Sequence, residues 1–259
     1  MKKQPAPTPN DRPLLAALDA AEPRPQPDGE RGEKKNYAER LSRRLAELVA
    51  NALRRWFPDA SPFEGSGHET EFGGDSGTKR IDVSAWDRQL GLRLDVSIKT
   101  YSFRDYSPKT KKLGRFTKNL LRNDHELRAE ADTIHRRQPY SVLVAIMFMP
   151  YEASSDGKTG RSSFAHAVMT FRKRTGRSDP EHSRFDRFEA VYIGLYEHEG
   201  PRRGFARFFD VTRNPPRNGH PRDDSLLTFS ELISEIKHLH DVRNDLAEPD
   251  WAEPGEIDD

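Results

Sequence analysis

Cysteine is absent from the sequence. This excludes disulfide bonds, thiolate zinc sites and cysteine nucleophiles, so a bound metal would have to be held by oxygen or by histidine. Long apolar runs are absent too: no segment approaches the ~20 apolar residues of a membrane span, and the polar N-terminus lacks a signal-peptide core. We therefore expect a cytoplasmic protein without a membrane partner.

The chain also lacks a surplus of charge of one sign, because 43 basic residues face 42 acidic ones and the net charge is +1. Attraction to nucleic acid would have to come from local clusters of basic residues. Motifs that bind ATP or NAD, and the serine-hydrolase elbow, are missing as well. The nine histidines form no recognisable metal-binding motif.

The length of 259 residues suits one domain with short extensions. Residues 1–36 contain seven prolines among polar residues, which predicts a disordered N-terminal arm. A folded domain is expected over 37–243, followed by an acidic, disordered tail over 244–259.

Hydrophobic periodicity within 37–243 predicts alternating helices and strands. The expected order is a helix over 37–57, a hairpin of strands over 79–86 and 91–100, a helix over 117–137, a buried strand over 140–149, a helix over 164–174, strands over 188–196 and 205–212, and a helix over 228–242. This order indicates an α/β fold with a mixed central sheet flanked by helices.

Polar residues recur on the second strand of the predicted hairpin. Strand alternation places Asp95, Ser97 and Lys99 on one face and apolar residues on the other. Asp82 lies on the first strand. Carboxylates that hold a divalent cation, next to a lysine, are suited to phosphodiester hydrolysis, and oxygen ligands favour Mg²⁺ or Mn²⁺.

The segments Lys-Arg-Ile-Asp82-Val and Leu-Asp95-Val-Ser97-Ile-Lys99 resemble the PD-(D/E)XK signature of restriction-endonuclease-like nucleases. The resemblance covers about residues 37–150. It implies a restriction-endonuclease-like core and a Mg²⁺-dependent DNA endonuclease, with a setting in restriction or antiviral (phage) defence. It also implies that Asp82, Asp95, Ser97 and Lys99 line the catalytic site.

One position departs from that signature, because Ser97 stands where the family has an acid two residues before the lysine. The expected replacements are carboxylates on the same strand, on the first helix or on the loop after it: Asp95, Glu39, Glu69 and Glu71. We favour Asp95, because it shares the strand face with Ser97 at about 6.6 Å along the strand. The metal ligands expected with Asp82 are therefore Asp95, Glu39 and Glu71.

Basic residues interleaved with aromatic ones follow Lys99. The residues expected to track a nucleic-acid backbone are Arg104, Lys109, Lys111, Lys112, Arg115, Lys118 and Arg122. A second basic group could contact the other side of a duplex: Arg202, Arg203, Arg207, Arg213 and Arg217.

Two alternatives stay open on the sequence alone. Ser97 could mark a degenerate PD-(D/E)XK fold that lost its metal and serves as a nucleic-acid-binding or scaffold subunit. A nuclease of the same fold could instead be RNA-directed or act in DNA repair. DNA is the favoured partner, and the chain could act as a homodimer or as a subunit of a defence complex.

Overall fold

A computed structural model describes residues 11–64, 70–74, 77–86, 93–107, 109–181 and 184–245, and it describes the backbone alone for 70–74, 77–80 and 244–245. The helices are α1 (Leu15–Ala21), α2 (Arg31–Leu53), α3 (Leu120–His135), α4 (Ser163–Phe171) and α5 (Phe229–Asp245). The strands are β1 (Thr70–Gly74), β2 (Gly77–Ile81), β3 (Val83–Trp86), β4 (Arg93–Thr100), β5 (Tyr106–Ser107), β6 (Lys112–Leu113), β7 (Val142–Pro150), β8 (Ala190–Tyr196), β9 (Ala206–Asp210) and β10 (Leu226–Leu227).

The centre of the molecule is a six-stranded mixed sheet with the strand order β10-β9-β8-β7-β4-β3. Strands β3 and β4 form the predicted antiparallel hairpin, whereas β4, β7 and β8 run parallel. All nine residues of β7 are buried, as predicted for the strand over 140–149. The predicted α/β fold with a mixed sheet and flanking helices is therefore confirmed.

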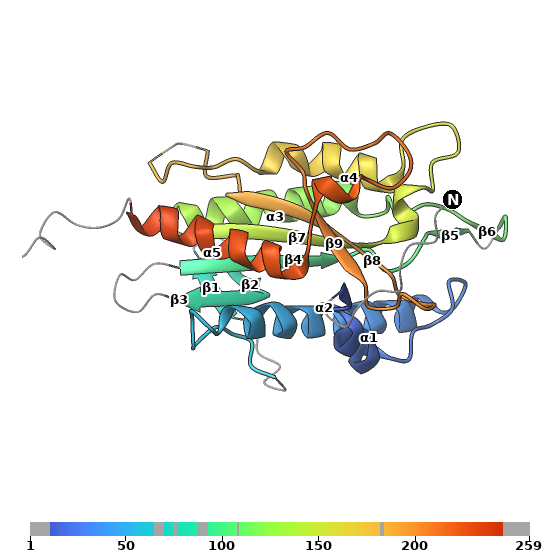
Figure 1. Ribbon diagram of the computed structural model, residues 1–259, viewed down its shortest axis with the longest axis horizontal. Helices are drawn as coiled ribbons and strands as arrows, with labels where there is room; N and C mark the ends of the chain where they lie inside the picture. Colours follow the sequence, from blue (N-terminus) through green and yellow to red (C-terminus); the bar gives the residue numbers. More distant parts are fainter. Residues whose placement is uncertain are drawn as a thin grey trace, which may run out of the picture.

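Helices cover both faces of the sheet (Figure 1). On one face, α1, α2 and α5 pack against the even-numbered residues of β4 and β7, including Val96, Ile98 and Val144. On the other face, α3 and α4 pack against the odd-numbered residues of β7. Because Ser97 pairs with Ala145 and Lys99 with Met147 in the parallel register, the polar residues of β4 face α3.

The predicted disorder of the N-terminal arm is wrong for residues 11–36. Leu14, Leu18 and the last residue of α1 are fully buried against α2, and α2 itself begins at Arg31. Gly204, at φ +87°, allows close docking, since a Cβ there would lie 2.7 Å from Leu15. The prolines suggested disorder, but the leucine spacing supplies an apolar helix face that α2 covers. Residues 1–10 lie outside the described part of the chain.

Three smaller differences concern element boundaries. The strand predicted over 79–86 is divided by a bend at Asp82 into β2 and β3. Two short hairpins, β1–β2 and β5–β6, were not predicted. Helix α5 continues to Asp245, and the rest of the predicted tail lies outside the described residues. Within the described ranges, no helix combines the length and the apolar character needed to cross a membrane.

Candidate active site

Asp82 is held at the bend between β2 and β3, on the edge of the hairpin. Its Oδ2 accepts a hydrogen bond of 2.7 Å from the backbone N–H of Ile98 on β4. Because this bond crosses from one strand to the other, it places the Asp82 carboxylate next to the stretch of β4 that carries Ser97 and Lys99. The bend that divides the predicted strand therefore positions the acid.

Ser97 and Lys99 both reach a glutamate of α3. The Ser97 hydroxyl donates to Glu130 Oε2 at 3.2 Å, and Lys99 Nζ lies 3.9 Å from the same oxygen. Ser97 and Glu130 are buried, and the Lys99 side chain is 22% exposed. Helix α3 thus supplies a carboxylate at the position where the β4 triplet has serine.

The surroundings of Glu130 favour its protonated form. The pKa of its carboxyl group is raised to about 7, chiefly by burial; Lys99 and the Ser97 hydroxyl lower it, and Asp82 and Asp95 raise it. Lys99 is the cationic side chain that contacts Glu130, and burial still outweighs its effect on the pKa of Glu130. A cation at this place would lower the free energy of the ionised pair.

This donor set fits a hard divalent cation. Mg²⁺ is usually held by one or two protein carboxylates and keeps several of its waters, so Asp82 and Glu130 suffice as anchors. No group of three or more histidine, aspartate or glutamate side chains that could hold a metal occurs within the described ranges. Glu71 pairs with Arg80 across the β1–β2 hairpin, but its side chain is outside the description, as is Glu69 altogether. Their roles stay predictions.

Asp95, the acid favoured from the sequence, already has a partner on its own strand. Arg93 Nε donates to Asp95 Oδ1 at 2.7 Å, and both side chains are almost completely buried. Burial raises the pKa of Asp95, while Arg93 lowers it. The carboxylate that contacts Ser97 is therefore Glu130, and Asp95 is engaged in an ion pair beside it.

Glu39 is the clearest error among the predicted ligands. Its side chain is 63% exposed and lies 3.5 Å from Lys35 on the outer surface of α2. Moreover, α2 covers the sheet face opposite to the one that carries Ser97. The apolar stripe of α2 runs through Tyr37 and Leu41, which turns Glu39 away from the sheet.

Sequence reasoning missed Glu130, although a signal was present. Leu127 and Ile134 belong to the apolar stripe of α3, and Glu130 lies three residues after the first and four before the second. Helical spacing puts all three on one face. An acid inside an apolar stripe is a candidate for a buried functional group, since burying an unpaired charge is costly.

The basic segment after Lys99 divides into exposed and paired residues. Lys109, Lys111 and Lys112 are exposed on and beside the β5–β6 hairpin. The other four lie near acids: Arg104 at 3.0 Å from Glu152, Arg115 at 3.6 Å from Asp156, Lys118 at 3.5 Å from Asp105, and Arg122 at 2.7 Å from Glu126. The three lysines are thus the best placed for a phosphate backbone.

The second basic group is not one surface. Arg203 forms ion pairs with Asp19 and Glu22, and Arg207 Nη2 lies 2.6 Å from Asp11 Oδ1, so both arginines hold the N-terminal segment. Arg213 and Arg217 are exposed on the segment that follows β9, away from the contacts with the N-terminal segment. The prediction that all five residues grip a duplex together is therefore wrong.

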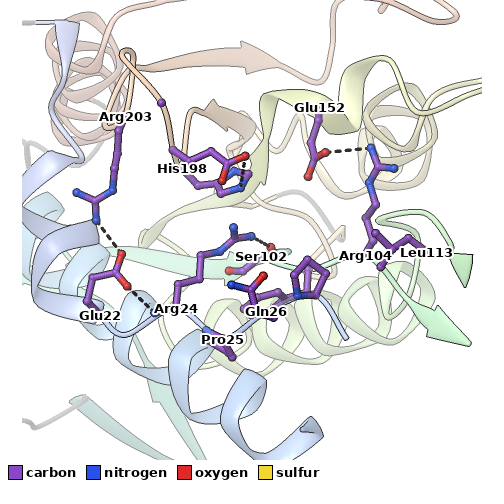
Figure 2. A pocket seen from close by; sticks show the side chains of 14 residues that line it. Glu22, Arg24, Pro25, Gln26, Ser102, Arg104, Leu113, Glu152, His198 and Arg203 are labelled. Carbon is purple, nitrogen blue, oxygen red and sulfur yellow. Dashed lines mark hydrogen bonds and ion pairs between the residues drawn. The ribbon is translucent and has the colours of Figure 1, made fainter. Parts of the chain in front are cut away.

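A separate pocket of about 460 Å³ opens beyond the carboxyl ends of β4, β7 and β8 (Figure 2). Its arginines face acids across the opening, Arg203 against Glu22 and Arg104 against Glu152. Burial, followed by the nearby Arg24, lowers the pKa of His198 to about 4. None of Asp82, Ser97, Lys99 and Glu130 lines this pocket, so it is distinct from the candidate active site.

Comparison of the chain with models of protein families, with curated proteins and with solved structures gave no match.

Proposed function

We propose that this protein is a metal-dependent nuclease that hydrolyses phosphodiester bonds of DNA on a restriction-endonuclease-like core. The observation that carries the proposal is the contact of Glu130 with Ser97 and Lys99. It supports a site in which the acid absent from the β4 triplet comes from α3. With Asp82, the site then has two carboxylates and a lysine around one point of the sheet.

Asp82 and Glu130 are the residues that would hold Mg²⁺ or Mn²⁺. The bound cation would supply an activated water and neutralise charge that develops on the phosphate. Asp82 is oriented for this by the Ile98 amide, and Glu130 by the Ser97 hydroxyl. Lys99 is partly exposed next to them, where its ammonium group can donate to a phosphate oxygen or orient the attacking water.

The order of elements also supports the restriction-endonuclease-like core. Helix α2 precedes the hairpins, β4 carries the Asp-x-Ser-x-Lys stretch, and α3 leads to the parallel, buried strand β7. This is the order that the resemblance implies. The exposed lysines of the β5–β6 hairpin follow β4 directly and extend a basic surface away from Lys99.

Relocation of the carboxylate tests the proposal. Glu130→Gln should reduce Mg²⁺-dependent cleavage of plasmid DNA by at least about 100-fold. The double variant Ser97→Asp with Glu130→Gln should regain part of the lost rate, because it restores an acid at the same place. Glu126→Gln, one helical turn before Glu130 and with a side chain that is 41% exposed, is the matched control and should cut like the wild type.

Two outcomes would contradict this assignment. If Glu130→Gln is folded by circular dichroism and cuts DNA at the wild-type rate, Glu130 has no part in catalysis. If the wild type cuts neither DNA nor RNA with Mg²⁺ or Mn²⁺, the protein is not a nuclease, and the binding or scaffold role becomes the better description.

A further inference from the structure

Three arginines from separate segments meet at the exposed side of α4. Arg161 and Arg217 line two adjoining pockets of about 410 and 250 Å³, and Arg115 lines the larger one. His166 and Met169 of α4 complete the larger pocket, and Met169 is 46% exposed. No acid occurs among the described residues that line these two pockets. We call this surface the arginine cleft and define it by Arg115, Arg161, His166, Met169 and Arg217.

Backbone hydrogen bonds fix the two segments that carry Arg161 and Arg217. The N–H of Ser162 donates to the Arg217 carbonyl at 2.8 Å, which places the two arginines on neighbouring stretches of chain. Asn218 donates to the Gly157 carbonyl at 2.6 Å and accepts from its N–H at 3.3 Å. The guanidinium groups are therefore presented from loops whose relative position is set before any ligand arrives.

Arg115 is joined to the same scaffold. Its Nη2 donates to the Arg161 carbonyl and lies 3.6 Å from Asp156, whose side chain is 1% exposed. Asp156 also accepts hydrogen bonds from the N–H and the hydroxyl of Ser163 at the start of α4. This buried acid compensates part of the charge of Arg115, and the exposed side of the cleft, with Arg161 and Arg217, stays cationic.

We propose that the arginine cleft binds phosphates of a nucleic-acid backbone outside the active site. Guanidinium groups offer paired N–H donors that match phosphate oxygens, and no acid in the described lining of the two pockets competes for those of Arg161 and Arg217. Exposed apolar surface in the cleft is limited to one methionine, which does not suit insertion into a lipid surface. The choice of nucleic acid among polyanions rests on the proposed nuclease function.

The position of the cleft fits a substrate that also reaches the active site. Helices α3 and α4 lie side by side on the same face of the sheet (Figure 1), and α3 carries Glu130. Arg115 follows the β5–β6 lysines within the same segment of chain. A duplex that contacts the lysines can therefore continue along Arg115 into the cleft.

Fluorescence anisotropy with a labelled DNA duplex tests this inference, with EDTA present so that no cleavage occurs. The variant Arg161→Ala with Arg217→Ala should bind at least about tenfold more weakly, and the salt dependence should become shallower by about 2 units, at ~0.9 per lost phosphate contact. The matched control is Arg31→Ala with Arg43→Ala, two exposed arginines on α2 across the sheet. It should bind nearly as the wild type does.

An unchanged affinity and salt slope in the cleft variant would overturn the inference. So would binding of the wild type to phosphatidylserine vesicles but not to DNA. If the cleft variant loses DNA binding while the wild type cuts no nucleic acid, the cleft stands and the nuclease proposal fails. If the wild type cuts DNA and the cleft variant binds DNA normally, the nuclease proposal stands and the proposed role of the cleft fails.

Discussion

Glu130, on α3, and Glu189, just before β8, are two buried glutamates whose surroundings differ. Glu189 accepts from Arg177 and Arg243, each at 2.9 Å, and from the Leu143 N–H at 2.7 Å. His135 lies 3.5 Å away. Glu130 has one lysine at 3.9 Å and one hydroxyl. The Glu189 carboxylate thus has several hydrogen-bond donors and cations around it, whereas the Glu130 carboxylate has one hydroxyl donor and one lysine.

The pKa shifts follow this difference. Burial raises the pKa of Glu189, but His135, Arg243 and the backbone amide outweigh burial, so that the pKa is lowered. Burial of Glu130 is not outweighed, and its pKa rises to about 7. Removal of a buried acid that is fully paired leaves its partners uncompensated, whereas a buried acid with few partners is itself costly to ionise and marks a candidate functional site.

The largest effect expected from this comparison is on catalysis. Lys99→Ala and Asp82→Asn should each reduce DNA cleavage by about 1000-fold or more, because each removes a charge that acts on the reacting phosphate or its cation. Duplex binding should persist. If either folded variant cleaves DNA at the wild-type rate, the active site does not lie at Asp82 and Lys99.

The next largest effect is on stability. Glu189→Gln should lower the free energy of unfolding by about 3–5 kcal/mol, because Arg177 and Arg243 stay buried without their counter-charge. Glu130→Gln should cause no loss at pH 8 (about 1 unit above its pKa), since it removes a charge that is costly to bury. Urea unfolding measures both. If both variants lose the same free energy of unfolding, the two glutamates do not differ in how well their charges are compensated.

A pH dependence of stability should also separate the two sites. The folded protein holds the Glu130 proton with a pKa of about 7, against 4.5 for an ordinary glutamate. Stability from this group is therefore full below 4.5 and is lost as the pH rises through about 7, by up to about 3 kcal/mol without divalent ions. Unfolding of wild type and Glu130→Gln across this range measures the difference. The same slope in both would exclude Glu130 as its source.

The smallest effect concerns the basic hairpin. Replacing Lys109, Lys111 and Lys112 with alanine should weaken DNA binding and reduce its salt slope by up to about 2 to 3 units, at ~0.9 per contact. Protein stability should not change, because all three side chains are exposed. Anisotropy titrations at several salt concentrations measure the slope, and an unchanged slope would mean that the hairpin is only solvated.

The sequence predicted the features that depend on local periodicity. The β3–β4 hairpin, α3, the buried β7 and the polar face of β4 all follow from alternation or helical spacing. Docking of α1 was not predictable in the same way, because its apolar face is short and its partners lie on α2 and near Gly204. Long-range packing decides whether a short apolar patch stays in solvent.

Only part of the candidate site was predicted, because local spacing identifies the residues of the strand but not the side chains that other elements bring to it. Strand alternation aligned Ser97 and Lys99, but which acid fills the gap depends on a helix more than 30 residues later in the chain. Arg93 also shares the face of Asp95 at the spacing of two residues, so their ion pair could have been expected. That pairing is what makes Asp95 a weaker ligand candidate than Glu130.

Calorimetric titration with Mg²⁺ is the most direct test of the carboxylate pair formed by Asp82 and Glu130. Glu130→Gln should weaken Mg²⁺ binding by at least about tenfold, and adding Ser97→Asp should restore part of the affinity. Asp95→Asn, in a protein shown to be folded, should bind Mg²⁺ nearly as the wild type does. If Glu130→Gln titrates like the wild type while Asp95→Asn does not, the metal ligand is Asp95 and the central claim is contradicted.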